Sequence, residues 1–305
     1  MLRVIGIGDN FVDCYIDTST IYPGGNSVNF SVYARQMGFE SAYCGVFAND
    51  DEAKLIQGVL DDIGIDYSHC TFMSDGETGK GYIRLIDGDR IITDANDGGS
   101  VKSNPLFITD ELLEYFSGFD VIHTACYGFL ESQLKKIASC GVPVVYDFSD
   151  EWGVEIFKKV CPDIEIAFIS GGNHSDEQLR TALIQAHANG CSISIATIGK
   201  RGALAFDGRQ FYSKKPYEAG DHIVDTMGAG DSFLTGFVVS YYSGKKLFEN
   251  LNTGSLKSNL SAFEQEDYYS RLIEYSMCVA NLQAIKSCMI NGAFGMGIPF
   301  FGNIK

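Results

Sequence analysis

The feature that most limits how this chain can fold is a regular alternation of short apolar stretches with segments of helical pattern. Continuous apolar runs of strand length lie at 3–8, 41–47, 120–125, 142–148, 164–170 and 192–199. Helical patterns lie between them at 26–37, 51–63, 131–140, 152–160 and 175–188. Strands that are apolar at every position are typical of a parallel sheet covered by helices on both faces. The sequence therefore predicts a doubly wound, mostly parallel α/β fold.

Two regions depart from this alternation. The stretch "TGKGYIRLIDGDRIITDAND" (78–97) has the pattern of two strands joined by a turn at "DGD", and 14–22 has that of another exposed strand. We expect lid strands at about 13–22 and 78–97, inserted in a single domain that spans 1–305. The polar segment 244–270 lacks a clear apolar stripe, so it is predicted to be a surface excursion between helices at 229–242 and 268–288.

Composition limits the partners. A net charge of −16 argues against nucleic-acid and anionic-membrane surfaces, which both favour basic patches. The nine cysteines are scattered singly, which is typical of reduced thiols in a cytoplasmic protein. The opening "MLRVIGIGDNF" is predicted to be a strand rather than a signal peptide, and no apolar run approaches the roughly 18 residues of a membrane span. The five histidines have no spacing typical of a metal site.

The stretch "DTMGAGDSFLTGF" (225–237) places two glycines and an aspartate, Asp231, where a helix is expected to begin. One interpretation is structural, with glycines for packing and Asp231 as an ordinary N-terminal carboxylate. A dinucleotide-binding turn is a weaker interpretation, because a third glycine is missing and the motif lies late in the chain. In the third, backbone amides hold a phosphoryl group while Asp231 takes a hydroxyl proton.

Two further clusters point to a polyhydroxyl ligand. In "YPGGNSVNF" (22–30), Gly25 precedes a helix whose Asn26 and Asn29 share one side, and asparagines both donate to and accept from hydroxyl groups. The alternative for Asn26 is a helix N-cap. In "GIGDNFVDCY" (6–15), Asp9 and Asp13 follow the first strand, where ligands of open α/β sheets bind. Asp9 is expected either to meet an ammonium or hydroxyl group of a ligand or to bind its own backbone.

Together, "GGNSVNFSVYARQMG" and "DTMGAGDSFLTGF" resemble the two signatures of the ribokinase-like (PfkB) carbohydrate kinases, in the right order and separation. The similarity extends over nearly the whole chain. Within that family, "GDNFVDCY", "VYDFSDEWG" and "DTMGAGDSF" are most similar to fructoselysine 6-kinases, with fructokinases next.

The resemblance implies a ribokinase-like fold with a β lid, and transfer of the γ-phosphoryl group of ATP to a sugar hydroxyl with Mg²⁺. By position it implies that Asp231 is the catalytic base and that Gly228, Ala229 and Gly230 form an anion hole. The sugar would contact Asp13, Gly25, Asn26 and Asn29, and ATP would lie along Thr197, Gly199 and Gly202 with Asn281 near the adenine. In some members, positions matching Asp225 and Thr226 lie near a monovalent cation such as K⁺, and some form homodimers through the lid.

One stretch departs from the family pattern. Where the family usually has N-x-x-E after the strand at 164–170, this chain has "SGGN", residues 170–173. Mg²⁺ is therefore expected to be held mostly by ATP and water. The sequence favours a kinase for a fructosamine such as fructoselysine, with fructose or another ketose as the alternative acceptor. Outside this class, a sugar-binding regulator without catalysis, or an oxidoreductase, are the rival interpretations.

Overall fold

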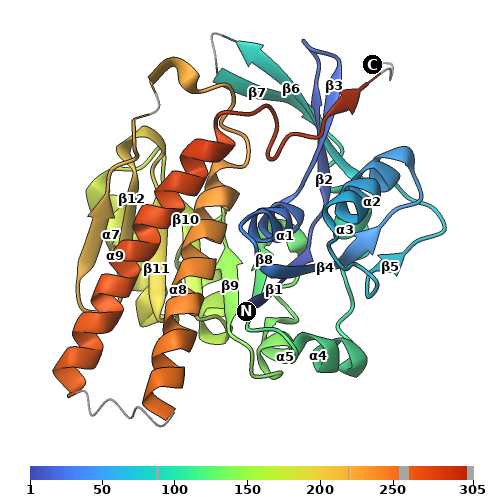
Figure 1. Cartoon of the computed structure of the whole chain (residues 1–305). Helices are drawn as coiled ribbons and strands as arrows, with labels where there is room; N and C mark the ends of the chain where they lie inside the picture. Colours follow the sequence, from blue (N-terminus) through green and yellow to red (C-terminus); the bar gives the residue numbers. More distant parts are fainter. Residues whose placement is uncertain (87–88, 219, 254–260, 301–305) are drawn as a thin grey trace.

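A computed structural model describes residues 1–86, 89–218, 220–253 and 261–300, and it contains two sheets (Figure 1). The large sheet has the strand order β13-β12-β11-β10-β9-β8-β1-β4-β5. Its strands are β1 (Arg3–Gly8), β4 (Glu40–Phe47), β5 (Thr71–Phe72), β8 (Val121–Ala125), β9 (Val144–Asp147), β10 (Ile166–Ser170), β11 (Ile193–Thr197), β12 (Ala203–Phe206) and β13 (Phe211–Lys214). Neighbouring strands from β5 to β11 pair in parallel, and only β12 and β13 are antiparallel.

Helices cover both faces of this sheet, as expected for a doubly wound fold. On one face, α1 (Asn26–Gln36), α8 (Ala229–Thr253) and α9 (Ala262–Ser287) bury apolar side chains against the strands. The other face is covered by α4 (Asp110–Phe116), α5 (Leu134–Ala138), α6 (Val154–Val160) and α7 (Asp176–Ala188). Two further helices, α2 (Asp51–Ile63) and α3 (Gly99–Ser103), lie near β4 (Figure 1). The predicted fold class is confirmed, although α5 is shorter than the expected helix at 131–140.

Strand β1 lies where the order of the sheet reverses. It pairs with β4 on one side and with β8 on the other, and β8 to β11 follow one another outward from there. At such a switch point, the connections leave the carboxyl ends of neighbouring strands in opposite directions and open a crevice. The residues that follow β1, β8 and β9 therefore lie at the edge where a ligand is expected.

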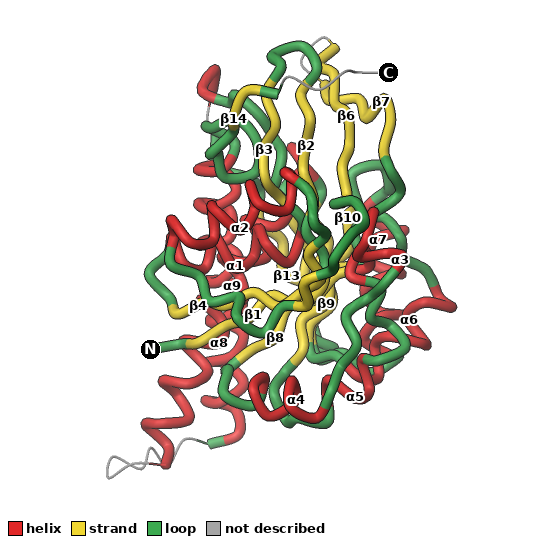
Figure 2. Tube along the Cα trace, turned by 90° about the vertical axis from the view of Figure 1, so that its right-hand side faces the viewer, coloured by secondary structure: helices red, strands yellow, loops and turns green. Residues whose placement is uncertain are grey.

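The smaller sheet, with the order β14-β3-β2-β6-β7, stands beyond this edge (Figure 2). Its strands are β2 (Phe11–Tyr15), β3 (Thr20–Gly24), β6 (Gly79–Ile86), β7 (Asp89–Ala95) and β14 (Ile298–Pro299). The single exposed strand expected at 14–22 is wrong, because a turn with Ser19 at φ 49° separates β2 from β3. Val12 and Cys14 are fully buried in β2. That this sheet acts as a lid stays a prediction.

The segment 244–270 is not a surface excursion within the described residues. Helix α8 continues to Thr253 and α9 begins at Ala262, so most of the segment extends a helical pair (Figure 1). The ring of Phe248 stacks on Tyr268 with centroids 4.3 Å apart, and Gly244 lets Leu272 approach the backbone of α8. Phe248 and Tyr268, two aromatic residues in a polar stretch, supply apolar contact without forming a regular stripe.

All nine cysteines are free thiols. No helix of the described residues combines the length and apolar character needed to cross a bilayer.

Candidate active site

Asp231 lies in the first turn of α8, and two side chains of α1 hold its carboxylate. Asn26 Nδ2 donates to Asp231 Oδ1 at 3.0 Å, and Asn29 Nδ2 donates to Asp231 Oδ2 at 2.6 Å. The three residues come from the two glycine-containing motifs, 202 or more positions apart in the sequence. The structure therefore brings together the predicted base and two of the predicted sugar-contacting residues.

The environment of Asp231 raises the basicity of its carboxylate. Burial raises its pKa well above the ordinary value, and the negative charge of Asp147 raises it further, against the opposing hydrogen bond from Asn29. A carboxylate with a raised pKa accepts a proton from a hydroxyl group more readily. Asp231 is therefore suited to the role of a general base.

Asp147 is a candidate site residue that sequence reasoning missed. It ends β9, and its Oδ2 accepts from Asn26 Nδ2 at 3.2 Å, so the same amide nitrogen donates to Asp147 and Asp231. Burial raises the pKa of Asp147 to about 6. The available signal was its position: an aspartate at the carboxyl end of a buried strand, in the same kind of place as Asp9.

Asp9 braces the start of α1. Its carboxylate accepts from the amide of Asn26 at 2.6 Å, the amide of Ser27 at 3.1 Å and the hydroxyl of Ser27 at 2.9 Å. Burial raises its pKa, while these hydrogen bonds lower it. A carboxylate at a helix N-terminus satisfies amides that have no partner within the helix. Asp9 thus positions Asn26 through its backbone.

Asp13 and Asn29 face a common space in front of Gly24. A Cβ atom at Gly24 would lie 3.3 Å from Asp13 Oδ2 and 3.6 Å from Asn29 Oδ1. Asn29 is buried, and its Oδ1 has no hydrogen-bond partner among the described residues. Gly25, at φ 105°, turns the chain into α1. A Cβ atom at this position would lie 2.8 Å from Asn10 Cα. An unpartnered buried acceptor beside a carboxylate suits a ligand that brings hydroxyl donors.

The predicted anion hole precedes and opens α8. Gly228 has φ 69°, and a Cβ there would meet Tyr33 Oη at 2.4 Å, so this position requires glycine. Ser232 N donates to Gly228 O at 2.8 Å, which begins the helical hydrogen bonds. The amides of Gly230 and Asp231 belong to the first turn, where N–H groups have no partner within a helix. Ala229 N forms only a 3.3 Å turn bond to Thr226 O. This arrangement can hold an anion beside the carboxylate of Asp231.

The residues predicted to lie along ATP follow β11. Thr197 ends the strand, and Gly199 has φ 55° with no atom within 4 Å of its Cβ position. A Cβ at Gly202 would lie 2.0 Å from Lys214 O, so close packing against the backbone requires glycine at this position. Asn281 is buried and donates to Lys215 O at 3.2 Å. Gly202 and Asn281 therefore both meet the chain at 214–215.

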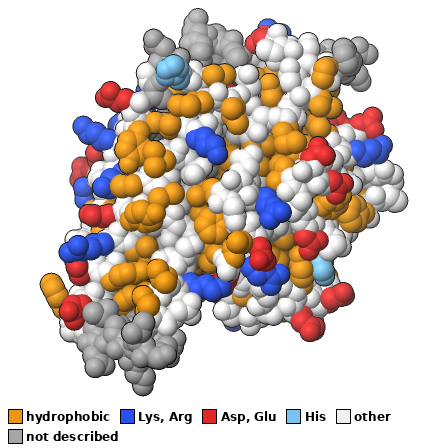
Figure 3. Space-filling model, viewed as in Figure 1, with side chains coloured by type: hydrophobic (Ala, Val, Ile, Leu, Met, Phe, Trp, Pro, Cys, Tyr) orange, Lys and Arg blue, Asp and Glu red, His pale blue; other side chains and the backbone are white. Residues whose placement is uncertain are grey.

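Apolar side chains are exposed on the same side of the molecule as α9 (Figure 3). Leu282, next to Asn281, is exposed, and so is Val224. The amide of Val224 donates to the carbonyl oxygen of Cys288, which caps the end of α9. Apolar surface beside a buried asparagine suits a planar base with polar edges.

Asp225, expected near a monovalent cation, is buried and braces three segments. Its carboxylate accepts from Tyr15 Oη at 2.5 Å, from Met227 N at 2.9 Å and from Gly292 N at 2.9 Å. Thr226 is exposed. A carboxylate that already accepts from three donors fits a structural role, so we derive no step through K⁺.

Carbonyl groups of the stretch "SGGN" face the guanidinium group of Arg201. Arg201 Nη2 lies 3.3 Å from both Gly171 O and Gly172 O, and 2.6 Å from His174 O. Among the described residues, no group of three or more histidine, cysteine, aspartate or glutamate side chains could hold a metal ion. That Mg²⁺ entering with a nucleotide is held mostly by phosphate and water oxygens stays a prediction.

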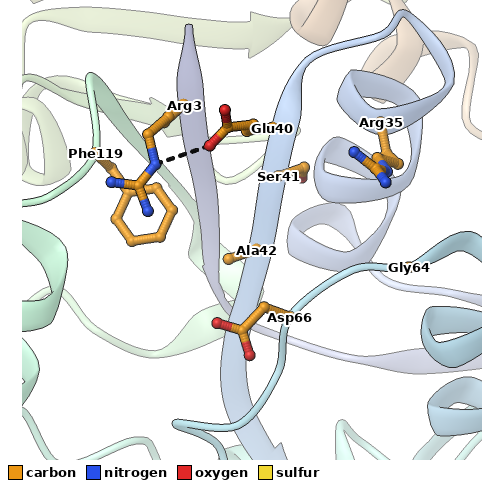
Figure 4. Close-up of a pocket in the computed structure, with 8 residues that line it drawn as sticks. All are labelled: Arg3, Arg35, Glu40, Ser41, Ala42, Gly64, Asp66 and Phe119. Carbon is orange, nitrogen blue, oxygen red and sulfur yellow. Dashed lines mark ion pairs between the residues drawn. The ribbon is translucent and has the colours of Figure 1, made fainter. Parts of the chain in front are cut away.

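Two cavities lie away from these residues. One, of about 200 Å³, is at the amino-terminal edge of the large sheet (Figure 4). It is lined by Arg3, Arg35, Glu40, Ser41, Ala42, Gly64, Asp66 and Phe119. The other, of about 440 Å³, lies between Trp152 and α7. Neither includes a predicted site residue, and we place the site at the carboxyl edge because the convergent polar groups are there.

Comparison with known families decides among the interpretations. The sequence pattern of the family described as "pfkB family carbohydrate kinase" matches residues 10–270, which is most of the chain. The chain belongs to the pfkB family of carbohydrate kinases. It is therefore a phosphotransferase, and the oxidoreductase and non-catalytic interpretations are set aside.

Two curated relatives are similar over most of this kinase. Fructosamine kinase FrlD of Bacillus subtilis (strain 168) is 33% identical over 98% of this chain and 95% of its own length. Fructoselysine 6-kinase of Escherichia coli (strain K12) is 30% identical over 84% of this chain and 95% of its own length.

Solved structures confirm the ribokinase fold of the kinase. The Arabidopsis thaliana ribokinase complexed with ribose and ATP has a TM-score of 0.75 at 19% identity and covers 98% of this chain and 96% of its own. A Vibrio cholerae O395 fructokinase variant in a form with fructose, ADP and potassium ion has a TM-score of 0.68 at 18% identity, with coverages of 97% and 95%.

Proposed function

We propose that this kinase transfers the γ-phosphoryl group of ATP to the 6-hydroxyl of a fructosamine such as fructoselysine, in the cytoplasm. The observation that carries the proposal is the similarity, over nearly full length, to a fructosamine kinase and a fructoselysine 6-kinase. The arrangement of Asp231, Asn26 and Asn29 supports it, because these groups can hold and deprotonate a sugar hydroxyl.

The acceptor hydroxyl would donate a hydrogen bond to a carboxylate oxygen of Asp231. As the hydroxyl oxygen forms a bond to the γ-phosphorus, its proton passes to Asp231, and the bond from the γ-phosphorus to the β–γ bridging oxygen breaks to release ADP. Asn26 and Asn29 keep the carboxylate oriented through this transfer. Amides of Gly228, Ala229 and Gly230 would stabilise the charge on the transferring group.

ATP would lie from Gly199 toward Asn281, with its phosphates directed at the start of α8. Gly199 leaves open space for a ligand, and the exposed apolar side chains beside Asn281 would face the adenine. Mg²⁺, when bound, would neutralise the negative charges of the phosphates. Asp13 and the free Oδ1 of Asn29 would meet the sugar hydroxyls.

Release of ADP from ATP, measured with fructoselysine, other fructosamines and fructose, tests the proposal. We expect the highest kcat/KM with a fructosamine. Asp231→Asn should lower kcat by about 10² to 10⁴-fold, since asparagine cannot accept the proton. Asp110→Asn, which changes an exposed carboxylate paired with Lys136, is the matched control. Equal or better turnover of fructose by the unmodified enzyme would leave only a general sugar kinase.

A further inference from the structure

The amide of Asn26 joins two carboxylates that have different surroundings. Its Nδ2 atom lies 3.0 Å from Asp231 Oδ1 and 3.2 Å from Asp147 Oδ2. An amide nitrogen carries two N–H groups, so it can donate to both. Asp231 stands beside the amides that would hold phosphate, whereas Asp147 stands at the end of β9 and contacts the same Asn26 nitrogen from a different element. One sugar placed over Asn26 can therefore meet Asp231 and Asp147 with different parts of its skeleton.

The site contains negative charge without a cation of the protein to balance it. Among the described residues, no lysine, arginine or histidine nitrogen forms an ion pair with Asp9, Asp147 or Asp231. Asp9 takes three donors from the start of α1, and Asp231 takes donors from both asparagines. Asp147 accepts from Asn26 Nδ2 and from the amide of Ser149 at 2.8 Å, and both donors are uncharged. A buried carboxylate with only neutral partners gains most from a cationic ligand.

A second observation supports a ligand at this cluster. Asn29 donates to Asp231, and its other amide atom, Oδ1, is buried without a partner among the described residues. Thr124 Oγ1, near the end of β8 and paired in register with Tyr146 of β9, is likewise buried and unpartnered. Buried acceptors are rarely left without a donor, so hydroxyl groups from a ligand are expected here.

We propose that Asp147 is the residue that recognises the amine of the fructosamine. Its carboxylate forms a charge-assisted hydrogen bond with the protonated secondary amine at C1, while Asp231 engages the hydroxyl at the opposite end of the same sugar. The inference rests on the proposed function and names the residue that separates fructosamines from neutral ketoses. Asp9, the residue that the sequence offered for an ammonium group, is occupied in bracing α1.

The test compares two acceptors of similar size that differ in charge. 1-Ethylamino-1-deoxyfructose, a fructosamine, carries a protonated secondary amine at C1, and 1-acetamido-1-deoxyfructose carries a neutral amide in its place. We expect the ratio of their kcat/KM values, cationic over neutral, to exceed 10-fold in the unmodified enzyme. Asp147→Asn should reduce that ratio by about 10- to 100-fold, the effect of weakening a hydrogen bond between charged groups.

Asp150→Asn is the matched control, because it removes a carboxylate from the same loop. Asp150 accepts a hydrogen bond from the hydroxyl of Tyr127 at 3.3 Å, whereas Asn26 donates to Asp147. The ratio should keep its value in this variant. An equal fall in both variants would assign the preference to general acidity and overturn the proposal.

Other outcomes are also decisive. If Asp147→Asn lowers kcat/KM for both acceptors by the same factor, Asp147 acts only through Asn26, and the proposal is refuted. If the variant does not fold, the acceptor pair still decides with the unmodified enzyme, since equal kcat/KM values exclude recognition of the charge. If the unmodified enzyme phosphorylates neither acceptor but does phosphorylate fructose, the proposed function itself has failed.

Discussion

Ionisation of Asp147 should cost the ligand-free protein stability, and replacing it with asparagine should remove that cost. The carboxylate is buried, and burial is the largest cause of its raised pKa, with the charges of Asp9 and Asp150 adding to it. Hydrogen bonds from Ser149 and Asn26 act in the opposite direction. In the unfolded chain the same group is solvated and has its ordinary pKa.

The magnitude follows from the difference between the two states. The pKa is about 6 in the folded protein against a reference value of 3.8. Between these values the folded state binds more protons than the unfolded state, so the free energy of unfolding falls as the pH rises. The stabilising contribution is present at low pH and is lost as the pH passes through about 6. The full slope is about 1.4 kcal/mol per pH unit, but the folded group is already half ionised at about pH 6, so the loss between about pH 4.5 and about pH 6 is about 1.5 kcal/mol.

Urea denaturation without ligands, at several pH values in this window, measures the effect. The free energy of unfolding of Asp147→Asn minus that of the unmodified protein should increase by about 1.5 kcal/mol from the lower to the upper pH. Asp110→Asn, at an exposed position, should give a nearly constant difference. A difference for Asp147→Asn that stays constant or decreases with pH would refute the argument that its charge is uncompensated in the folded state.

Three further predictions concern other parts of the molecule. Gly228→Ala should lower kcat by about 10²-fold, because a Cβ at φ 69° collides with Tyr33 and displaces the amides proposed to form the anion hole. Unchanged turnover in steady-state kinetics would contradict this. Phe248→Ala should lower the free energy of unfolding by about 3 to 5 kcal/mol in urea, whereas the exposed neighbour Leu247→Ala should change it by about 0.5 kcal/mol or less. Excess chelator should abolish ADP release, since Mg²⁺ neutralises the phosphates of ATP, and activity that persists would overturn the metal requirement.

The sequence predicted those parts of the fold that follow from local pattern. Apolar runs located the central strands, and the two glycine motifs located Asn26, Asn29 and Asp231 before their contacts were known. The alternation of apolar and polar residues could not reveal how the ends of α8 and α9 pair, because a few aromatic contacts, such as Phe248 on Tyr268, replace a regular stripe there.

The sequence could not predict the distribution of roles among the aspartates. Asp9 and Asp147 occupy similar positions, each at the carboxyl end of a buried strand, so the local sequence pattern does not distinguish them. Asp9 meets the backbone of α1, while Asp147 meets a side chain 121 positions away. Only the order of strands in the sheet and the direction of α1 distinguish them, and both are tertiary properties.

The hydrogen bond from Tyr15 to Asp225 gives the small sheet a mechanical connection to the start of α8. Tyr15 and Asp13 lie two positions apart on β2, and Asp225 also holds the amides of Met227 and Gly292. A rotation of the small sheet that moves Tyr15 must either break a bond to a buried carboxylate or pull the backbone at 225–227 with it. Asp13 and the backbone amides that follow Met227 are thereby coupled, so that displacement of one is transmitted as displacement of the other.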